Sequence, residues 1–147
     1  MSDIVFILGA GASAECGGPL MWNFLDKAND LLRSGTIAEY RESFERVFNA
    51  IGGLQAVHSK AEINLQNIES VFTAFEMAKI IKRLPGTDTD CQEDGVNLVI
   101  RALKQLIAVT LEESILFRVD NKQLVAPAAY FELAKLLKFI QERRKPA

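Results

Sequence analysis

Only one segment of this chain has the pattern of a β-strand buried on both faces, and it lies at the N-terminus. Residues Ile4–Leu8 (IVFIL) form a continuous apolar run rich in β-branched residues, with no polar alternation. Such runs are typical of strands in parallel sheets that helices cover on both sides. Burying a strand whose backbone groups have no partner costs about 1–3 kcal/mol for each group. The run therefore predicts a sheet with further strands.

Every later segment has helical periodicity, with apolar residues recurring on one face. The glycines at 35 and 52–53 predict helix ends, Thr36 with Glu39 predicts a capping box, and Asn67 is suited to cap a helix. The predicted helices cover residues 19–35, 36–52, 96–117 and 127–140, and one more that starts between residues 64 and 67 and ends at 84. Their predicted inward residues include Phe44, Val47, Ile51, Ile68, Val71, Phe75, Ile81, Val99, Leu103 and Leu106.

The connections between these helices contain no convincing second strand. Residues 85–95 are rich in Asp, Thr and Gly and predict a surface loop, which Asp94 would end by capping the next helix. Leu124-Val125-Ala126 is too short to be counted as a strand. Parallel neighbours of Ile4–Leu8 would have to be reached through helical crossovers, and the last helix has the length and polarity of one.

These observations predict the α/β class, with one strand and about five helices. We expect residues 1–147 to be the N-terminal portion of a single Rossmann-like parallel-sheet domain with a large helical insertion, truncated before its next strand. The alternative is an all-helical domain whose N-terminal segment is irregular.

Charge and hydropathy argue against several classes of partner. The chain has 17 Lys and Arg against 19 Asp and Glu, a net charge of −2, so it offers no basic excess to nucleic acid. The basic end at residues 143–145 is interpreted as a solvated helix end. No apolar run approaches the roughly 18 residues that span a membrane, and the N-terminus lacks the positive charge of a signal peptide. We expect no membrane partner.

Cysteine and histidine are too few for a metal site or a disulfide framework. The chain has two cysteines, Cys16 and Cys91, and one histidine, His58. We expect no metal ligands, a surface position for His58, and a packing role for Cys16. This usage predicts a cytoplasmic protein in a reducing compartment.

A glycine-rich turn follows the predicted strand directly. Residues 9–14 (GAGASA) have the spacing Gly-x-Gly-x-x-Ala of a dinucleotide-binding turn. Gly9 permits a sharp turn, and Gly11 lets the backbone approach a pyrophosphate with no Cβ between them. The amides at the start of the following helix would then face the phosphate. The alternative is a tight turn that binds nothing.

An ordinary Rossmann site would need more than this turn. It requires an acidic residue at the end of a second strand about 20 residues further on. Asp26 and Asp30 lie within a predicted amphipathic helix and cannot take that position. In addition, Gly17-Gly18-Pro19 interrupts the long helix that would bind the phosphate.

The same departures are features of another family. Residues 6–22, FILGAGASAECGGPLMW, resemble the opening of sirtuin-like domains, which have a strand, Gly-Ala-Gly-Ala-Ser, a short spacer, Gly-x-Pro and an aromatic residue. Trp22 replaces the Asp-Phe-Arg segment of deacylase sirtuins, so the chain most resembles the bacterial sirtuin-like NAD hydrolases of anti-phage defence. The sequence Asn67-Ile68-Glu69 at a helix start is similar to that branch as well. Elsewhere the resemblance is one of helical pattern.

The resemblance implies that NAD is the cofactor and that the domain cleaves the bond between nicotinamide and ribose. It places two groups of residues near NAD: Gly9, Ala10, Gly11, Ala12 and Ser13 around the pyrophosphate, and Gly18 and Pro19 near the nicotinamide ribose. The family's catalytic Asn and His lie in Thr-x-Asn-Tyr-Asp and His-Gly motifs, and neither motif is present here. No catalytic residue is therefore assigned, and we expect that this chain alone does not cleave NAD. A homo-oligomer, or a fused C-terminal effector or sensor region, is the expected partner.

Two other functions stay open. A non-enzymatic helical interaction or assembly module would use the N-terminal strand to pair with another chain. Protein deacylation is less favoured because the Asp-Phe-Arg segment and the zinc-binding cysteines of deacylase sirtuins are absent from the sequence.

Overall fold

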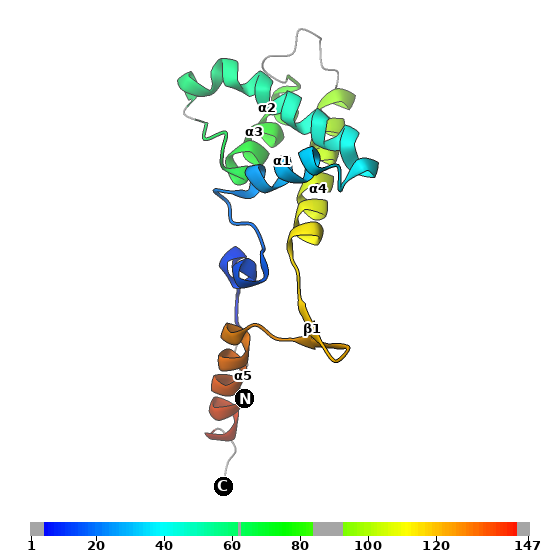
Figure 1. Ribbon diagram of the computed structural model, residues 1–147. Helices are drawn as coiled ribbons and strands as arrows, with labels where there is room; N and C mark the ends of the chain where they lie inside the picture. Colours follow the sequence, from blue (N-terminus) through cyan, green and yellow to red (C-terminus); the bar gives the residue numbers. More distant parts are fainter. Residues whose placement is uncertain (1–4, 62, 84–92, 144–147) are drawn as a thin grey trace.

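The structure is a computed structural model that describes residues 5–61, 63–83 and 93–143. Helices α1 to α4 form a bundle, while η1, the β1–β2 hairpin and α5 lie outside it (Figure 1). The elements are η1 (Ala10–Cys16) and η2 (Ala38–Tyr40), which are 3₁₀ helices, α1 (Phe24–Ser34), α2 (Arg41–Ala61), α3 (Ile68–Ile81), α4 (Glu93–Ser114), β1 (Arg118–Asp120), β2 (Gln123–Val125) and α5 (Ala128–Arg143).

The hydrophobic core lies where α4 packs against α1, α2 and α3. Phe44 of α2, Phe75 of α3 and Leu103 of α4 are completely buried in it. The predicted inward faces of α2, α3 and α4 are thus confirmed, with one error. Ile81 is 59% exposed, because it lies in the last turn of α3. The apolar stripes therefore specify the bundle, as is usual for helices that pack on one face.

Local signals fix several helix ends where the sequence predicts them. The Asn67 side chain accepts hydrogen bonds from the backbone N–H groups of Glu69 (2.8 Å) and Ser70 (3.3 Å), which makes it the N-cap of α3. Gly35 ends α1 in the left-handed region, with φ of 76°. α1 itself begins at Phe24 rather than at Pro19, because the Asn23 side chain accepts a hydrogen bond from Leu20 N–H (2.7 Å) in the turn before it.

The predicted capping box of Thr36 and Glu39 is wrong. The N-cap of η2 is Ile37, which makes no side-chain cap hydrogen bond, and α2 begins only at Arg41.

Two further predicted boundaries are wrong. Gly52-Gly53 does not end α2, which continues to Ala61. Glycine within a helix costs only about 1 kcal/mol, and the buried side chain of Leu54 anchors this turn of the helix in the core. Asp94 lies inside α4 rather than capping it. Most of the predicted loop at 85–95 lies outside the described residues.

The expected Rossmann-like parallel sheet is wrong. The structure is mostly helical, and its sheet consists of β1 and β2 paired antiparallel, with Val119 opposite Leu124. Among the described residues, Val5–Leu8 form no strand and are exposed; Ile4 lies outside them. The physical reason is that no later segment described here supplies a parallel neighbour, so burying this run would leave its backbone unpaired. The alternative of a helical domain with an irregular N-terminal segment agrees better with the structure.

The β1–β2 hairpin was missed from the sequence. Its two turn residues, Asn121 and Lys122, both have positive φ, of 46° and 64°, as in a type I′ turn. Asn121 is well suited to this conformation and was a sequence signal for the turn, but Lys122 is not typical of type I′ turns. The strands have only three residues each, so periodicity could not reveal them.

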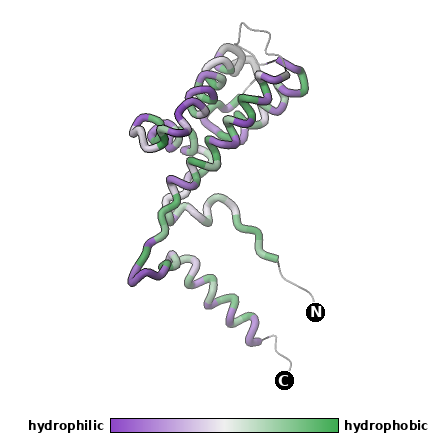
Figure 2. The backbone as a smooth tube through the Cα atoms, turned by 90° about the vertical axis from the view of Figure 1, so that its right-hand side faces the viewer, coloured by the Kyte–Doolittle hydropathy of each residue, from purple (hydrophilic) through white to green (hydrophobic). Residues whose placement is uncertain are grey.

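The N-terminal segment and α5 extend away from the bundle, and Figure 2 shows them separated from each other. No residue of η1, β1, β2 or α5 is buried. Large apolar side chains are accordingly exposed there, among them Phe6, Phe117, Phe131 and Phe139. Within the part of the chain that the structure describes, no helix is both long and apolar enough to cross a membrane.

Candidate functional site

Residues 9–18 form a compact turn, referred to below as the glycine turn. It begins with a hydrogen bond from Ala12 N–H to the Gly9 carbonyl oxygen (2.9 Å). The Ser13 hydroxyl donates to the Ala10 carbonyl oxygen (3.0 Å). The chain then reverses at Gly17, and Gly18 N–H donates back to the Ser13 carbonyl oxygen (3.0 Å). The turn thus brings Gly18 against Ser13.

Gly17 and Gly18 are required by the fold. Gly17 has a φ of 87°, and a Cβ there would lie 2.6 Å from the Ser114 carbonyl oxygen. A Cβ on Gly18 would lie 2.5 Å from the Ser13 hydroxyl oxygen. Conformation and close packing therefore account for both residues.

Gly9 and Gly11 are different, because nothing inside the described chain requires glycine at either position. Neither has a positive φ, and a Cβ on either would meet no atom within 4 Å. Both residues are exposed. Their backbone is open to close approach from outside the molecule.

The amide groups beside these glycines are available as donors. Among the described residues, the N–H groups of Ala10 and Gly11 have no hydrogen-bond partner. The following helix is the seven-residue 3₁₀ helix η1 rather than a long α-helix. Attraction of an anion would therefore rest on these amides and not on a helix macrodipole.

An apolar hollow of about 320 Å³ adjoins the far end of η1. Ser13 and Cys16 form one wall, and the other is formed by Phe117 before the hairpin, Val125 in β2 and Tyr130 in α5, among others. Its volume is at the small end of the range for ligand sites. A second hollow, of about 630 Å³, shares the Cys16 wall and is lined further by Glu15 and Phe131.

Two contacts hold α5 and the hairpin beside the glycine turn. The Glu15 carboxylate accepts hydrogen bonds from Ala128 N–H (3.2 Å) and Ala129 N–H (3.4 Å), the first residues of α5. Leu116 N–H donates to the Cys16 carbonyl oxygen (2.9 Å). The role of Glu15 could not be predicted from the sequence, because no local pattern links residues that lie more than a hundred positions apart.

The other residues singled out from the sequence lie in different environments. Gly18 and Pro19 are buried, so both have packing roles, and their proximity to a nicotinamide ribose stays a prediction. His58 lies in α2, and its side chain and Cys91 are outside what the structure describes. Cys16 is partly exposed and is a free thiol. No three potential metal ligands gather among the described residues.

No family model, curated protein or solved structure matches this chain.

Proposed function

We propose that this chain binds NAD and that residues Gly9–Ser13 hold the pyrophosphate, as in the NAD-binding part of the sirtuin-like NAD hydrolases of anti-phage defence. One observation carries the proposal: neither conformation nor packing requires glycine at positions 9 and 11. Glycine away from positive φ costs about 0.5–1 kcal/mol relative to alanine in regular structure. Close approach of a ligand to the backbone explains why both positions lack a side chain.

The surroundings fit a dinucleotide in two ways. The amides of Ala10 and Gly11 can donate hydrogen bonds to phosphate oxygens, and phosphate is a strong acceptor for such groups. The apolar hollow beside Ser13, with Tyr130 and Phe117 in its wall, suits one of the two rings of NAD. The proposal covers binding only, since the sequence contains neither Thr-x-Asn-Tyr-Asp nor His-Gly.

A ligand series tests the proposal. Full-length chain labelled with ¹⁵N is titrated with NAD, ADP and adenosine, and amide shifts are followed by NMR. We expect NAD and ADP to shift the amides of Ala10 and Gly11, and adenosine to leave them in place because it has no phosphate. The proposal is wrong if adenosine reproduces the shifts, or if NAD moves neither amide.

A second candidate function is assembly with another chain through the N-terminal segment. Val5, Phe6, Ile7 and Leu8 are 80%, 52%, 93% and 56% exposed. Exposed contiguous apolar side chains and unpaired backbone are typical of segments that pair with another protein. This function is compatible with NAD binding, since the apolar segment precedes the glycine turn.

A further inference from the structure

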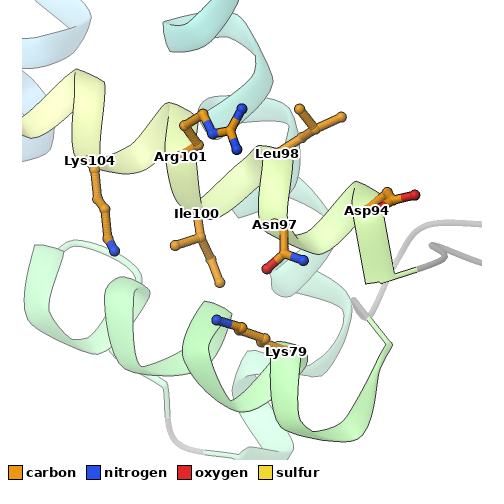
Figure 3. Close-up of a pocket in the computed structure, with 7 residues that line it drawn as sticks. All are labelled: Lys79, Asp94, Asn97, Leu98, Ile100, Arg101 and Lys104. Atoms are coloured by element: carbon orange, nitrogen blue, oxygen red, sulfur yellow. The ribbon is translucent and has the colours of Figure 1, made fainter.

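A separate hollow of about 530 Å³ opens between α3 and α4 (Figure 3). Its walls belong to the helical bundle, and no residue of the glycine turn, the hairpin or α5 takes part. Its lining residues are Lys79 of α3 and Asp94, Asn97, Leu98, Ile100, Arg101 and Lys104 of α4.

The hollow concentrates positive charge on a chain whose net charge is negative. It has three cationic side chains, from Lys79, Arg101 and Lys104, against the single carboxylate of Asp94. None of the three cations has an ion-pair partner among the described residues. On α2, by contrast, Arg41 and Arg46 are each paired with a glutamate at 2.7 Å.

Helix stabilisation explains only part of this arrangement. Lys79 lies in the last turn of α3, where a cation interacts favourably with the helix dipole. Arg101 and Lys104 lie three residues apart in the middle of α4. Like charges at helical neighbour positions cost roughly 0.2–0.5 kcal/mol. The residues four positions from Arg101 are Asn97 and Gln105. Those four positions from Lys104 are Ile100 and Ala108, and none of the four is acidic.

Side chains from both helices reach into the space between α3 and α4, whereas Arg101 and Leu98 extend from the other side of α4 (Figure 3). Figure 3 shows Lys104 and Ile100 extending from α4 toward α3, with the amino group of Lys79 turned toward them and Asn97 directed toward Lys79. Ile100 is only 6% exposed and provides an apolar floor. Two ammonium groups and a side-chain amide above an apolar floor match the needs of a phosphate group attached to an organic body.

We propose that the α3–α4 hollow binds a small phosphorylated molecule of mononucleotide size, with its phosphate between Lys79 and Lys104. Asn97, which points toward Lys79, can donate and accept hydrogen bonds with a hydroxyl group of the ligand. Arg101, which extends from the other side of α4 (Figure 3), adds positive potential from a greater distance. This site is independent of NAD binding at the glycine turn.

The test is an NMR titration of the full chain with AMP, orthophosphate and adenosine as separate probes. We expect AMP to shift the amides of residues 79 and 97–104, orthophosphate to shift the same amides more weakly, and adenosine to leave them unchanged. Lys79→Gln with Lys104→Gln should weaken AMP binding at these amides by about tenfold or more. The Gly11→Val variant should bind AMP here as the wild type does, which separates this site from the glycine turn.

The matched control is Lys27→Gln with Lys138→Gln, which removes two exposed cations outside the hollow and changes the net charge equally. It should leave the AMP affinity of the hollow unchanged. The proposal is overturned if the control weakens binding as much as the test variant does, since that result would show nonspecific attraction. It is also overturned if AMP at about 10 mM shifts none of these amides, or if orthophosphate binds as tightly as AMP, which would show an adventitious ion only.

Discussion

Gly18 lies so close to Ser13 that no side chain fits between them, whereas Gly11, in the same turn, faces open space. Changing each to alanine therefore separates the two reasons for glycine. Gly18→Ala should lower the free energy of unfolding by about 1–3 kcal/mol, because the new Cβ overlaps the Ser13 hydroxyl and the backbone must shift. Gly11→Ala should leave it unchanged or raise it slightly. Urea denaturation measures both, and equal stability of the two variants would contradict this account of packing.

The sequence could indicate that residues 9–18 form a glycine-rich turn but not which glycine serves which purpose. Gly17 and Gly18 are needed because of Ser114 and Ser13, and Ser114 is distant in the sequence. The resemblance to sirtuin-like domains implied that Gly18 lies near the nicotinamide ribose, which stays a prediction, and the structure gives Gly18 a packing role beside Ser13. The requirement for glycine depends on spatial neighbours and on φ, which only the three-dimensional structure defines.

At the scale of elements, the Glu15 carboxylate accepts hydrogen bonds from the first two backbone N–H groups of α5. Glu15→Ala should therefore reduce hydrogen-exchange protection in the first turn of α5, with a cost of about 0.5–2 kcal/mol typical of a lost cap. Glu132→Ala, which removes only an exposed pair with Lys135, is the control and should have a smaller effect. Unchanged exchange at Ala128 and Ala129 in the Glu15 variant would show that the contact does not hold the helix.

Helices α1 to α4 could be predicted because their apolar stripes and caps act within a few residues. Asn67 and Gly35 mark boundaries through their own side chain or φ. Gly52 wrongly predicted the end of a helix, because tertiary packing outweighs the low helix propensity of glycine. The hairpin could not be predicted, since strands of three residues contain too little pattern.

For the whole molecule, the main feature is exposed apolar surface outside the bundle. Val5–Leu8, the hairpin and α5 all present large apolar side chains, which favours association. We expect the chain to self-associate, and Phe6→Lys to reduce the association because a charge in the segment opposes both pairing and burial. Sedimentation velocity over a range of concentrations measures the effect. A monomeric wild type at all concentrations would contradict the expectation.

The fold class was wrong because residues 4–8 have a composition that suits two different environments. A buried central strand and an exposed segment that docks on another surface are both rich in Val, Ile and Phe. The sequence alone cannot say whether neighbouring strands exist. In the described structure none lies beside Val5–Leu8, and the bundle forms its core without them.

The central claim is that the glycine turn holds the pyrophosphate of NAD, and calorimetric titration of three proteins with NAD tests it most directly. These are the wild type, Gly11→Val, and the control Gly52→Val, which also places a side chain into open space but lies in α2. We predict that Gly11→Val weakens NAD binding at least tenfold, about 1.4 kcal/mol, because the branched side chain blocks the approach of the phosphate. Gly52→Val should bind as the wild type does. Equal NAD affinity of Gly11→Val and the wild type, or no NAD binding by the wild type, would contradict the claim.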